Sequence, residues 1–454
     1  MSLKLVAVKI PIKLTLAQLF SYCASEPWAL LLDSCNNAQA QWDMIFRQPV
    51  TTVTNSQAWP QQLAQALAQV PAYTGPDFLP FQGGLAGAWS YDCGRALEQL
   101  PSLATADIEL PDLSVGVYHQ ALMQQRSSGD TFLLAPAAQV QQLTDFWLTA
   151  QQHCQQQTPA SFWLAGDWQA NMDATSYATK FAQVQAYLRA GDCYQVNLAQ
   201  RFSASFQGST WAAYQALRSH NNAPYSAYMQ LPEGALLSLS PERFLAISPA
   251  GDVETKPIKG TRPRHPDPAQ DQLLADQLQQ ASKDRAENVM IVDLLRNDLS
   301  RCCLPDSVKV PRLFAIESYP AVHHLVSTVV GKLAQANQGL QLLGQCFPGG
   351  SITGAPKIRA MEVIEELEPH RRSYYCGSFG YFSQHGQADT SIAIRTLVAT
   401  HTQPGNSHSG TIHCWAGGGL VADSECASEY QETFDKVARI LPVLSALPKP
   451  EAQA

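Results

Sequence analysis

The chain lacks a long apolar run, a C-x-x-C motif and a cluster of basic residues. No hydrophobic stretch approaches the ~20 residues that cross a bilayer, so we expect no transmembrane helix. Lysines interrupt the apolar start at residues 1–10, and no cleavage site follows, which argues against a secretory signal. A net charge of −8 without a basic run argues against nucleic acid as a partner.

The cysteines follow no structural pattern. There are eleven, an odd number, with an adjacent pair at Cys302 and Cys303 and no C-x-x-C spacing. This usage is typical of reduced thiols rather than of a disulfide framework or a zinc site. The length of 454 residues, of which 45% are hydrophobic, supports one large composite domain or two domains. We expect a soluble globular protein of the cytoplasm.

Strand-like and helical segments are mixed along the chain without a regular β-α-β alternation. The Gln/Ala-rich stretch 137–160 is typical of a solvated helix and linker. Apolar spacing predicts a helix that begins near Tyr177 and ends at Gly191. Further helices are predicted over 282–296, 357–367 and 424–441, and strands over 193–206, 235–239, 244–247, 376–382, 393–399 and 411–415. This mixture favours the α+β class.

Lys259 is a candidate nucleophile. It stands at the end of the predicted strand 253–258 and beside Gly260, where a ligand can come close to the backbone. An ordinary lysine, with a pKa near 10.4, is almost fully protonated at pH 7. The role therefore requires desolvation or a neighbouring cation such as Lys256 to lower that pKa. A solvated surface lysine is the alternative, and this segment alone does not exclude it.

Acidic residues recur at helical spacing in two of the predicted helices. The C-terminal helix carries one charged stripe at steps of four, three and four residues, made of Glu425, Glu429, Glu432 and Lys436. The helix over 282–296 carries Asp284 and Glu287, three residues apart. If the two helices face each other, the oxygen-only site suits Mg²⁺. The alternative is two ordinary solvated acidic faces.

Two glycine-rich segments are candidate anion-binding turns. The segment 348–357 superficially resembles a phosphate loop, but Gly354 is followed by Ala-Pro-Lys where that motif needs Lys-Ser/Thr. Its amides and the hydroxyls of Ser351 and Thr353 are still available to an anion. The segment 416–419 precedes the acidic helix, and its amides are available to a carboxylate. Either segment is equally compatible with a simple turn.

Several single residues have two interpretations. Arg395 lies in the apolar segment 391–397, where a guanidinium needs either a ligand carboxylate or a structural ion pair. Glu242 is either a general acid or the partner of Arg243. The adjacent His323 and His324 face opposite ways if they lie on a strand, which makes them a poor metal motif.

Together these segments strongly resemble the chorismate-utilising enzymes, the family of anthranilate, isochorismate, salicylate and aminodeoxychorismate synthases. The resemblance runs from about Ser176 to the end, and its motifs are the segments 240–244, 257–261, 286–298, 323–327, 349–357 and 429–436. It implies a large two-sheet β-sandwich core with surrounding helices. It also implies an N-terminal region over 1–165, of the component I type, and a chorismate-binding catalytic region over 166–454.

The resemblance implies a binding role for several residues. A magnesium ion is expected on Glu287 and Glu432, with Asp284 and Glu429 in support. The groups expected to hold the enolpyruvyl carboxylate of chorismate are Arg395, Tyr375 and the amide of Gly417. Lys436 is expected near the ring carboxylate.

The resemblance also implies the reaction. Glu242 is expected to protonate the departing 4-hydroxyl while Lys259 attacks C2, and His324 and Thr261 are expected to line the same pocket. Ammonia then adds at C4 and expels the lysine, giving 4-amino-4-deoxychorismate on the route to p-aminobenzoate and folate. Anthranilate synthases carry alanine where this chain has Lys259, so their reaction is the less favoured alternative.

Two partners follow from the same resemblance. The chain has no glutaminase signature, since no cysteine lies in a Gly-x-Cys-x-Gly elbow with a downstream His-x-Glu. A separate glutamine amidotransferase subunit, component II, is therefore expected to supply ammonia. The segments Leu32–Ser34 and Asn222–Ser226 resemble the region where relatives bind tryptophan, which makes Ser34 a candidate for such a site.

Overall fold

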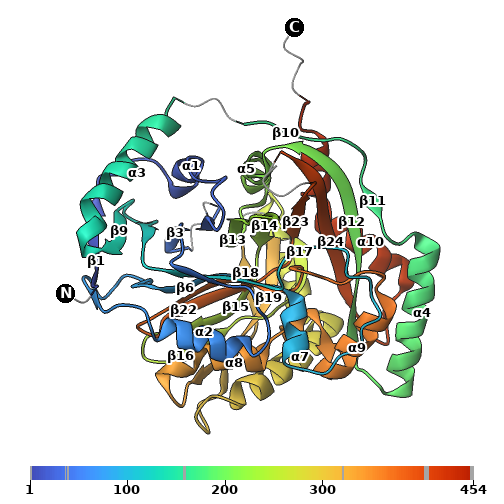
Figure 1. The fold of residues 1–454 in the computed structure, drawn as a ribbon. Coiled ribbons are helices and arrows are strands. Elements are labelled where there is room, and N and C mark those ends of the chain that lie inside the picture. The colour runs from blue at the N-terminus through green and yellow to red at the C-terminus, as the bar shows by residue number, and fades with distance from the viewer. Residues whose placement is uncertain are drawn as a thin grey trace.

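Two large, almost entirely antiparallel β-sheets organise the molecule (Figure 1). The structure is a computed structural model and describes residues 3–35, 37, 40–156, 160–319, 322–402 and 408–449. In that part of the chain, no helix is both long and apolar enough to cross a membrane. Strands and helices are mixed as the sequence predicts, and the α+β class is confirmed.

The larger sheet joins strands from both ends of the chain. Its described strands run in the order β10 (Phe162–Leu164), β12 (Gln195–Gly208), β24 (Ser409–Leu420), β23 (Thr396–His401), β14 (Gly234–Ser240), β13 (Tyr225–Gln230), β2 (Leu30–Asp33), β3 (Trp42–Phe46), β8 (Ala121–Gln125), β9 (Thr131–Pro136), β1 (Leu5–Ile10) and β5 (Tyr73–Thr74). The short strands β11 (Gln169–Ala170) and β20 (Gly354–Ala355) also pair with β12.

The smaller sheet also joins strands from distant parts of the chain. Its described strands run in the order β17 (Ile258–Pro263), β19 (Val322–Lys332), β16 (Asp252–Thr255), β15 (Arg243–Ile247), β22 (Ala388–Ile392), β21 (Ser378–Ser383), β6 (Gly84–Trp89), β7 (Leu113–Tyr118) and β4 (Thr51–Val53). A further strand, β18 (Lys309–Ser318), pairs with β19. Strands from both sides of residue 165 enter each sheet, and the division into 1–165 and 166–454 stays a prediction.

The main hydrophobic core lies between the two sheets. Met229 and Trp415 of the larger sheet pack there with Trp89 and Phe379 of the smaller one. A second core covers the outer face of the larger sheet, beneath α1 (Leu16–Phe20), α3 (Val140–Cys154), α5 (Thr210–Asn221) and α11 (Leu441–Ser445). The helix α3 buries Leu143 and Trp147 of the Gln/Ala-rich stretch, so that helix is only partly solvated.

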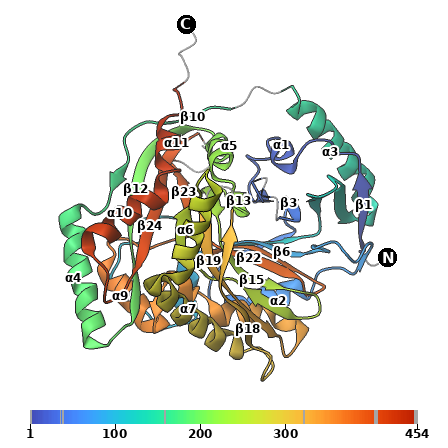
Figure 2. The same ribbon diagram turned by 180° about the vertical axis from the view of Figure 1, so that it is seen from behind.

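A third core joins the helices that surround the end of β12 and β24. These are α4 (Ala174–Ala190), α9 (Lys357–Leu367) and α10 (Cys426–Val437), at the opposite end of the molecule from α3 (Figure 1 and Figure 2). Asp173 caps α4 by accepting a hydrogen bond from the amide of Ser176, and Gly191 ends it at φ 80°, as the sequence predicts. The helix α9 has the predicted bounds.

The remaining helices flank the smaller sheet. The helices α6 (Pro268–Gln280) and α7 (Ser282–Ser300) pack on β17, β18 and β19, while α2 (Trp59–Leu67) packs on α8 (Gly339–Cys346). The helix predicted over 282–296 is therefore confirmed and extends further, to Ser300. The helix predicted over 424–441 is α10, which ends earlier, at Val437, and a separate short helix, α11, begins at Leu441.

Two local predictions were wrong. Lys259 does not end a strand, because the predicted strand is divided at Lys256–Pro257 and Lys259 is the second residue of β17. Arg395 does not lie in a strand either. It stands between β22 and β23 with φ 51°, in the left-handed region, so the chain turns there from one sheet into the other.

Candidate active site

Lys259 lies where the smaller sheet meets the helices α7 and α10. Its Nζ donates to the carbonyl oxygen of Ser351 at 3.4 Å. Burial of the amine lowers the pKa of Lys259, and the Lys436 charge lowers it further, whereas Glu287 and Glu242 raise it. Burial prevails, so the amine is easier to deprotonate than an ordinary lysine, as a nucleophile requires.

Glu242 is a buried carboxyl in the same site. It stands between β14 and β15 and is 6% exposed. Burial raises the pKa of Glu242 to about 7, although the Ser351 hydroxyl and Lys259 both act to lower it. Arg243 pairs with Asp389 at 3.0 Å and with Glu254 at 3.2 Å, so it is not the ion-pair partner of Glu242. A carboxyl with a pKa near neutrality can serve as a general acid.

Ser351 connects these two groups. Its hydroxyl donates to Glu242 Oε1 at 3.0 Å, while its carbonyl oxygen accepts from Lys259. The next residue, Ile352, is held by the buried Arg372, whose guanidinium donates to its carbonyl oxygen at 3.0 Å. The sequence offered the Ser351 hydroxyl either to an anion or to a simple turn, and it indicated neither this bridge nor Arg372. The only signal was the place of Ser351 after two glycines.

Four carboxylates, Asp284, Glu287, Glu429 and Glu432, approach the site from α7 and α10; we call them the acidic cluster. A β-carbon added at Gly418 would lie 3.0 Å from Glu429 Oε2 and 3.5 Å from Glu432 Oε1, so this glycine lets both carboxylates lie against β24. Burial raises the pKa of Glu287, and Lys259 and Lys283 oppose that effect. Glu425 precedes α10 and is not part of the helix.

The acidic cluster is neutralised by cationic side chains. Asp284 pairs with Arg262 at 3.2 Å, Glu432 with Lys436 at 2.6 Å, and Glu429 with Lys283 at 3.5 Å. Within the described ranges, no three His, Cys, Asp or Glu residues stand together as a ready metal site. A divalent ion would therefore have to displace at least one of these cations.

One buried polar group beside the acidic cluster bears on whether the site suits a hydrated cation. In the part of the chain that the structure describes, the Tyr177 hydroxyl has no hydrogen-bond partner, and Glu429 and Glu432 act electrostatically on it. The unpartnered amide of Gln195 faces Gly419 and so lies on the other face of β24 from the two carboxylates at Gly418. Carboxylate oxygens with spare polar groups for ligated water suit Mg²⁺, which keeps several waters. The donor set therefore fits that ion.

A cavity of about 290 Å³ brings three of the expected substrate ligands together: His324, Arg395 and Lys436. Lys436 Nζ donates to the carbonyl oxygen of Gly417 at 2.7 Å. The Thr261 hydroxyl and His324 Nδ1 are 2.9 Å apart, and burial lowers the pKa of His324 to about 4, which leaves the imidazole neutral at pH 7. Arg395 and Lys436 therefore supply the positive charge of the cavity, as a carboxylate ligand requires.

Two other expected ligands are not part of the cavity wall. Tyr375 is 3% exposed and stacks on Trp415, with ring centroids 6.1 Å apart. Gly417 pairs with Ala199 within the sheet. His323 faces away from the site, because its ring bonds to Ser318 and Asp271. The opposite orientation of the two histidines is therefore as the sequence predicts.

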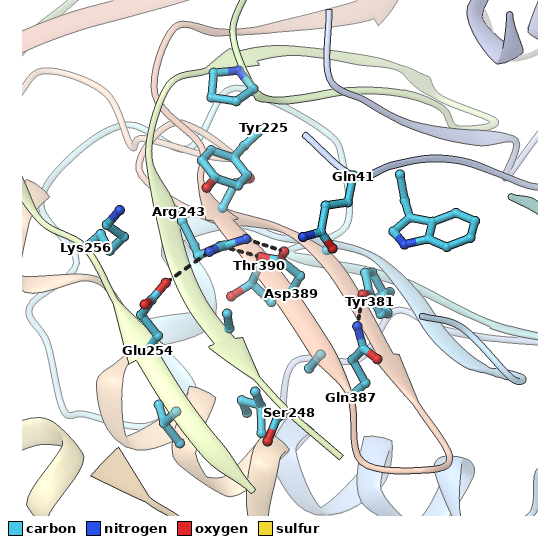
Figure 3. Close-up of a pocket in the computed structure, with 18 of the residues that line it drawn as sticks. Gln41, Tyr225, Arg243, Ser248, Glu254, Lys256, Tyr381, Gln387, Asp389 and Thr390 are labelled. Carbon is cyan, nitrogen blue, oxygen red and sulfur yellow. Dashed lines mark hydrogen bonds and ion pairs between the residues drawn. The ribbon is translucent and has the colours of Figure 1, made fainter. Parts of the chain in front are cut away.

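A second and larger cavity, of about 940 Å³, opens between the two sheets (Figure 3). Arg243 lies in its wall with Asp389 and Glu254, below Tyr225. Asp33 also lines it, while the neighbouring Ser34 donates its amide to Asp43 at 2.8 Å and keeps a buried hydroxyl without a partner among the described residues. Both segments expected at a tryptophan site thus meet at this cavity.

The chain resembles known proteins along nearly its whole length. Residues 28–442 match the family described as chorismate binding enzyme. Aminodeoxychorismate synthase component 1 of Klebsiella aerogenes is 50% identical over 447 residues, covering 93% of this chain and 95% of that protein. The Escherichia coli protein of the same name is 47% identical over 443 residues, covering 93% and 94%. The crystal structure of anthranilate synthase component I from Streptococcus pneumoniae is 27% identical with a TM-score of 0.77, covering 89% and 92%.

Proposed function

The chain belongs to the family of chorismate-binding enzymes, and from that premise we propose that it aminates chorismate at C4 to give 4-amino-4-deoxychorismate. The observation that carries this proposal is the Lys259–Ser351–Glu242 arrangement, in which one residue contacts both a partly buried amine and a carboxyl with a pKa of about 7. The identity of about half to two proteins named for this activity supports it. This product leads to p-aminobenzoate and folate.

The proposed reaction has two steps in which Lys259 is the temporary nucleophile. Its neutral amine forms a bond to C2, both ring double bonds shift, and the C4–O bond breaks as the Glu242 carboxyl protonates the departing hydroxyl. Water leaves, and the Glu242 carboxylate takes a proton from the new C2 nitrogen. Ammonia then bonds to C4, both double bonds shift back, and Glu242 protonates the departing lysine nitrogen. The added ammonia returns that proton, so the net change is ammonia for water.

Cationic side chains position the substrate in this proposal. Chorismate carries two carboxylates, and Arg395, Lys436 and neutral His324 share one small cavity. We assign the enolpyruvyl carboxylate to Arg395 and the ring carboxylate to the side of Lys436 and the acidic cluster. Glu287 and Glu432 would hold Mg²⁺, with Asp284 and Glu429 in support. Bound there, the ion would neutralise the ring carboxylate.

Ammonia and tryptophan belong to the same proposal. The relatives are named as component 1, which implies a second component, and we propose a glutamine amidotransferase in that role. We propose that tryptophan binds in the larger cavity, where Asp33 and Tyr225 of the two matching segments meet. Calorimetric titration with tryptophan tests this, and a lack of binding at millimolar concentration would exclude it.

The test of the function separates amination at C4 from amination at C2. Purified protein is incubated with chorismate, ammonium and Mg²⁺, and the product is identified by mass and chromatography. We expect 4-amino-4-deoxychorismate from the wild type and a loss of orders of magnitude in its formation by Lys259→Ala, because a nucleophile is removed. Without ammonia, the wild type should gain the mass of chorismate less water.

The matched control is Lys13→Ala, which removes an exposed lysine of the N-terminal segment. This variant should keep the wild-type rate. Undiminished formation of the 4-amino product by Lys259→Ala would show that Lys259 is not the nucleophile. Anthranilate as the wild-type product would favour the alternative reaction.

A further inference from the structure

Lys283 compensates one acid from each helix of the acidic cluster. It is the second residue of α7, and its Nζ is 3.5 Å from Glu429 Oε1 on α10. It also acts electrostatically on Glu287, one turn further along its own helix. The Lys283 side chain is 53% exposed, whereas that of Glu429 is 5% exposed. A single ammonium thus reaches the two helices from the solvent side.

The other cations of the acidic cluster are held more firmly. Lys436 has two contacts, with the Gly417 carbonyl oxygen at 2.7 Å and Glu432 at 2.6 Å. Arg262 donates to the Thr261 carbonyl oxygen at 2.9 Å as well as to Asp284. Lys283 has one long contact and a half-exposed side chain, so it can move into water at little cost.

We propose that Lys283 is a built-in counter-cation of the metal site, which balances Glu429 and Glu287 when no divalent ion is bound and turns into solvent when Mg²⁺ arrives. This inference rests on the metal site of the proposed function. An ammonium and a divalent ion a few ångströms apart repel each other, so the two compete for the same carboxylates. Lys283 therefore weakens Mg²⁺ binding to the substrate-free protein.

Metal binding itself, measured without substrate, tests this competition. Mg²⁺ is titrated calorimetrically into the wild type, Lys283→Met and Lys283→Arg, and Mn²⁺ binding is followed by electron paramagnetic resonance. Lys283→Met keeps the length of the side chain and loses its charge, so we expect a Kd lower by about three- to tenfold. Lys283→Arg keeps the charge and should have the wild-type Kd. Lys13→Met is the control for loss of an exposed lysine.

The outcomes separate this inference from the proposals on which it rests. An unchanged or higher Kd in Lys283→Met, with clear binding to the wild type, overturns the competition and leaves the metal site intact. An absence of binding to both proteins overturns the metal site and the inference together. The product assay on the same wild-type preparation shows independently whether the amination stands, and equal thermal unfolding temperatures show that the variants are folded.

Discussion

Ser351 shows how much of a site depends on one backbone position. Lys259 and Glu242 are both recognisable from the sequence as possible catalytic groups, each with an ordinary alternative. What removes the alternatives is burial together with the two contacts of Ser351, at 3.4 Å and 3.0 Å. The first contact joins residues that are 92 positions apart in the chain, and the second joins residues that are 109 positions apart. Local spacing cannot encode such a contact, so the bridge could not be predicted.

The raised pKa of Glu242 makes a prediction about stability. The carboxyl titrates near 7 when folded and near 4.3 when unfolded, so the folded state binds the proton more tightly. Its stabilising effect is complete below about pH 4.3 and is lost as the pH rises to about 7. Glu242→Gln should therefore be more stable than the wild type at pH 8, by on the order of 3 kcal/mol, and about equal to it at pH 4.

Urea unfolding at the two pH values measures this difference. Gln keeps an oxygen that can accept from Ser351, so loss of that bond does not confuse the result. Glu109→Gln, at an exposed position, is the control and should show no such pH dependence. A Glu242→Gln variant with the same stability gain at both pH values would mean that Glu242 is not protonated at neutral pH.

At the scale of elements, the helices α7 and α10 were the most predictable part of the site. Their spacing alone gives Asp284 with Glu287 and Glu429 with Glu432 as pairs on one face, and the structure brings both pairs to the same place. The sequence could not predict that Glu425 lies outside α10, because capping depends on the path of the preceding turn. Nor could it predict the turn at Arg395, which follows from the passage between two sheets.

Substitution of the acidic residues on α7 and α10 should reduce metal-dependent activity. Glu287→Gln and Glu432→Gln should each lower Mg²⁺-dependent turnover by at least about ten- to a hundredfold, because each removes a negatively charged ligand. Both variants should stay folded, because Glu287 has negatively charged neighbours and the Glu432–Lys436 pair is half exposed, so its loss costs little.

A magnesium titration of the amination rate is the measurement, with Glu425→Gln as the matched control on the same segment. The control should behave as the wild type, because Glu425 is exposed and outside the helix. Wild-type turnover of Glu287→Gln or Glu432→Gln at low Mg²⁺ would remove that residue from the metal site.

At the scale of the whole molecule, the class of fold was predictable and the strand order was not. Mixed segments without a steady β-α-β alternation favour the α+β class over a doubly wound sheet. The strand β13 pairs with β2, which lies about 190 residues earlier in the chain, and such a pairing could not be inferred from local patterns. The binding cavities lie where such distant segments meet, so their shapes could not be predicted from the sequence.

The choice of nitrogen donor is a prediction that concerns the whole molecule. Because the chain carries no glutaminase signature, we expect the isolated protein to use ammonium and not glutamine. At constant total ammonium the rate should rise as the pH approaches about 7, because more of the ammonium is neutral NH₃, and it should stop rising above that pH as Glu242 loses the proton that it donates. Product formation from each donor, measured by mass after removal of contaminating amidotransferase, decides this. Glutamine-dependent product from the purified chain would refute the two-subunit proposal.

The place of β24 in the larger sheet has a consequence for synthesis on the ribosome. This strand is inserted between β12 and β23, and it is followed directly by α10 with Glu432 and Lys436. A nascent chain that already contains Lys259 and Glu242 still lacks β24, the strand that joins β12 to β23. It also lacks α10, the helix that completes the acidic cluster. Chorismate therefore meets no finished site until α10 has been synthesised, and any truncation before residue 437 should yield a chain that cannot act.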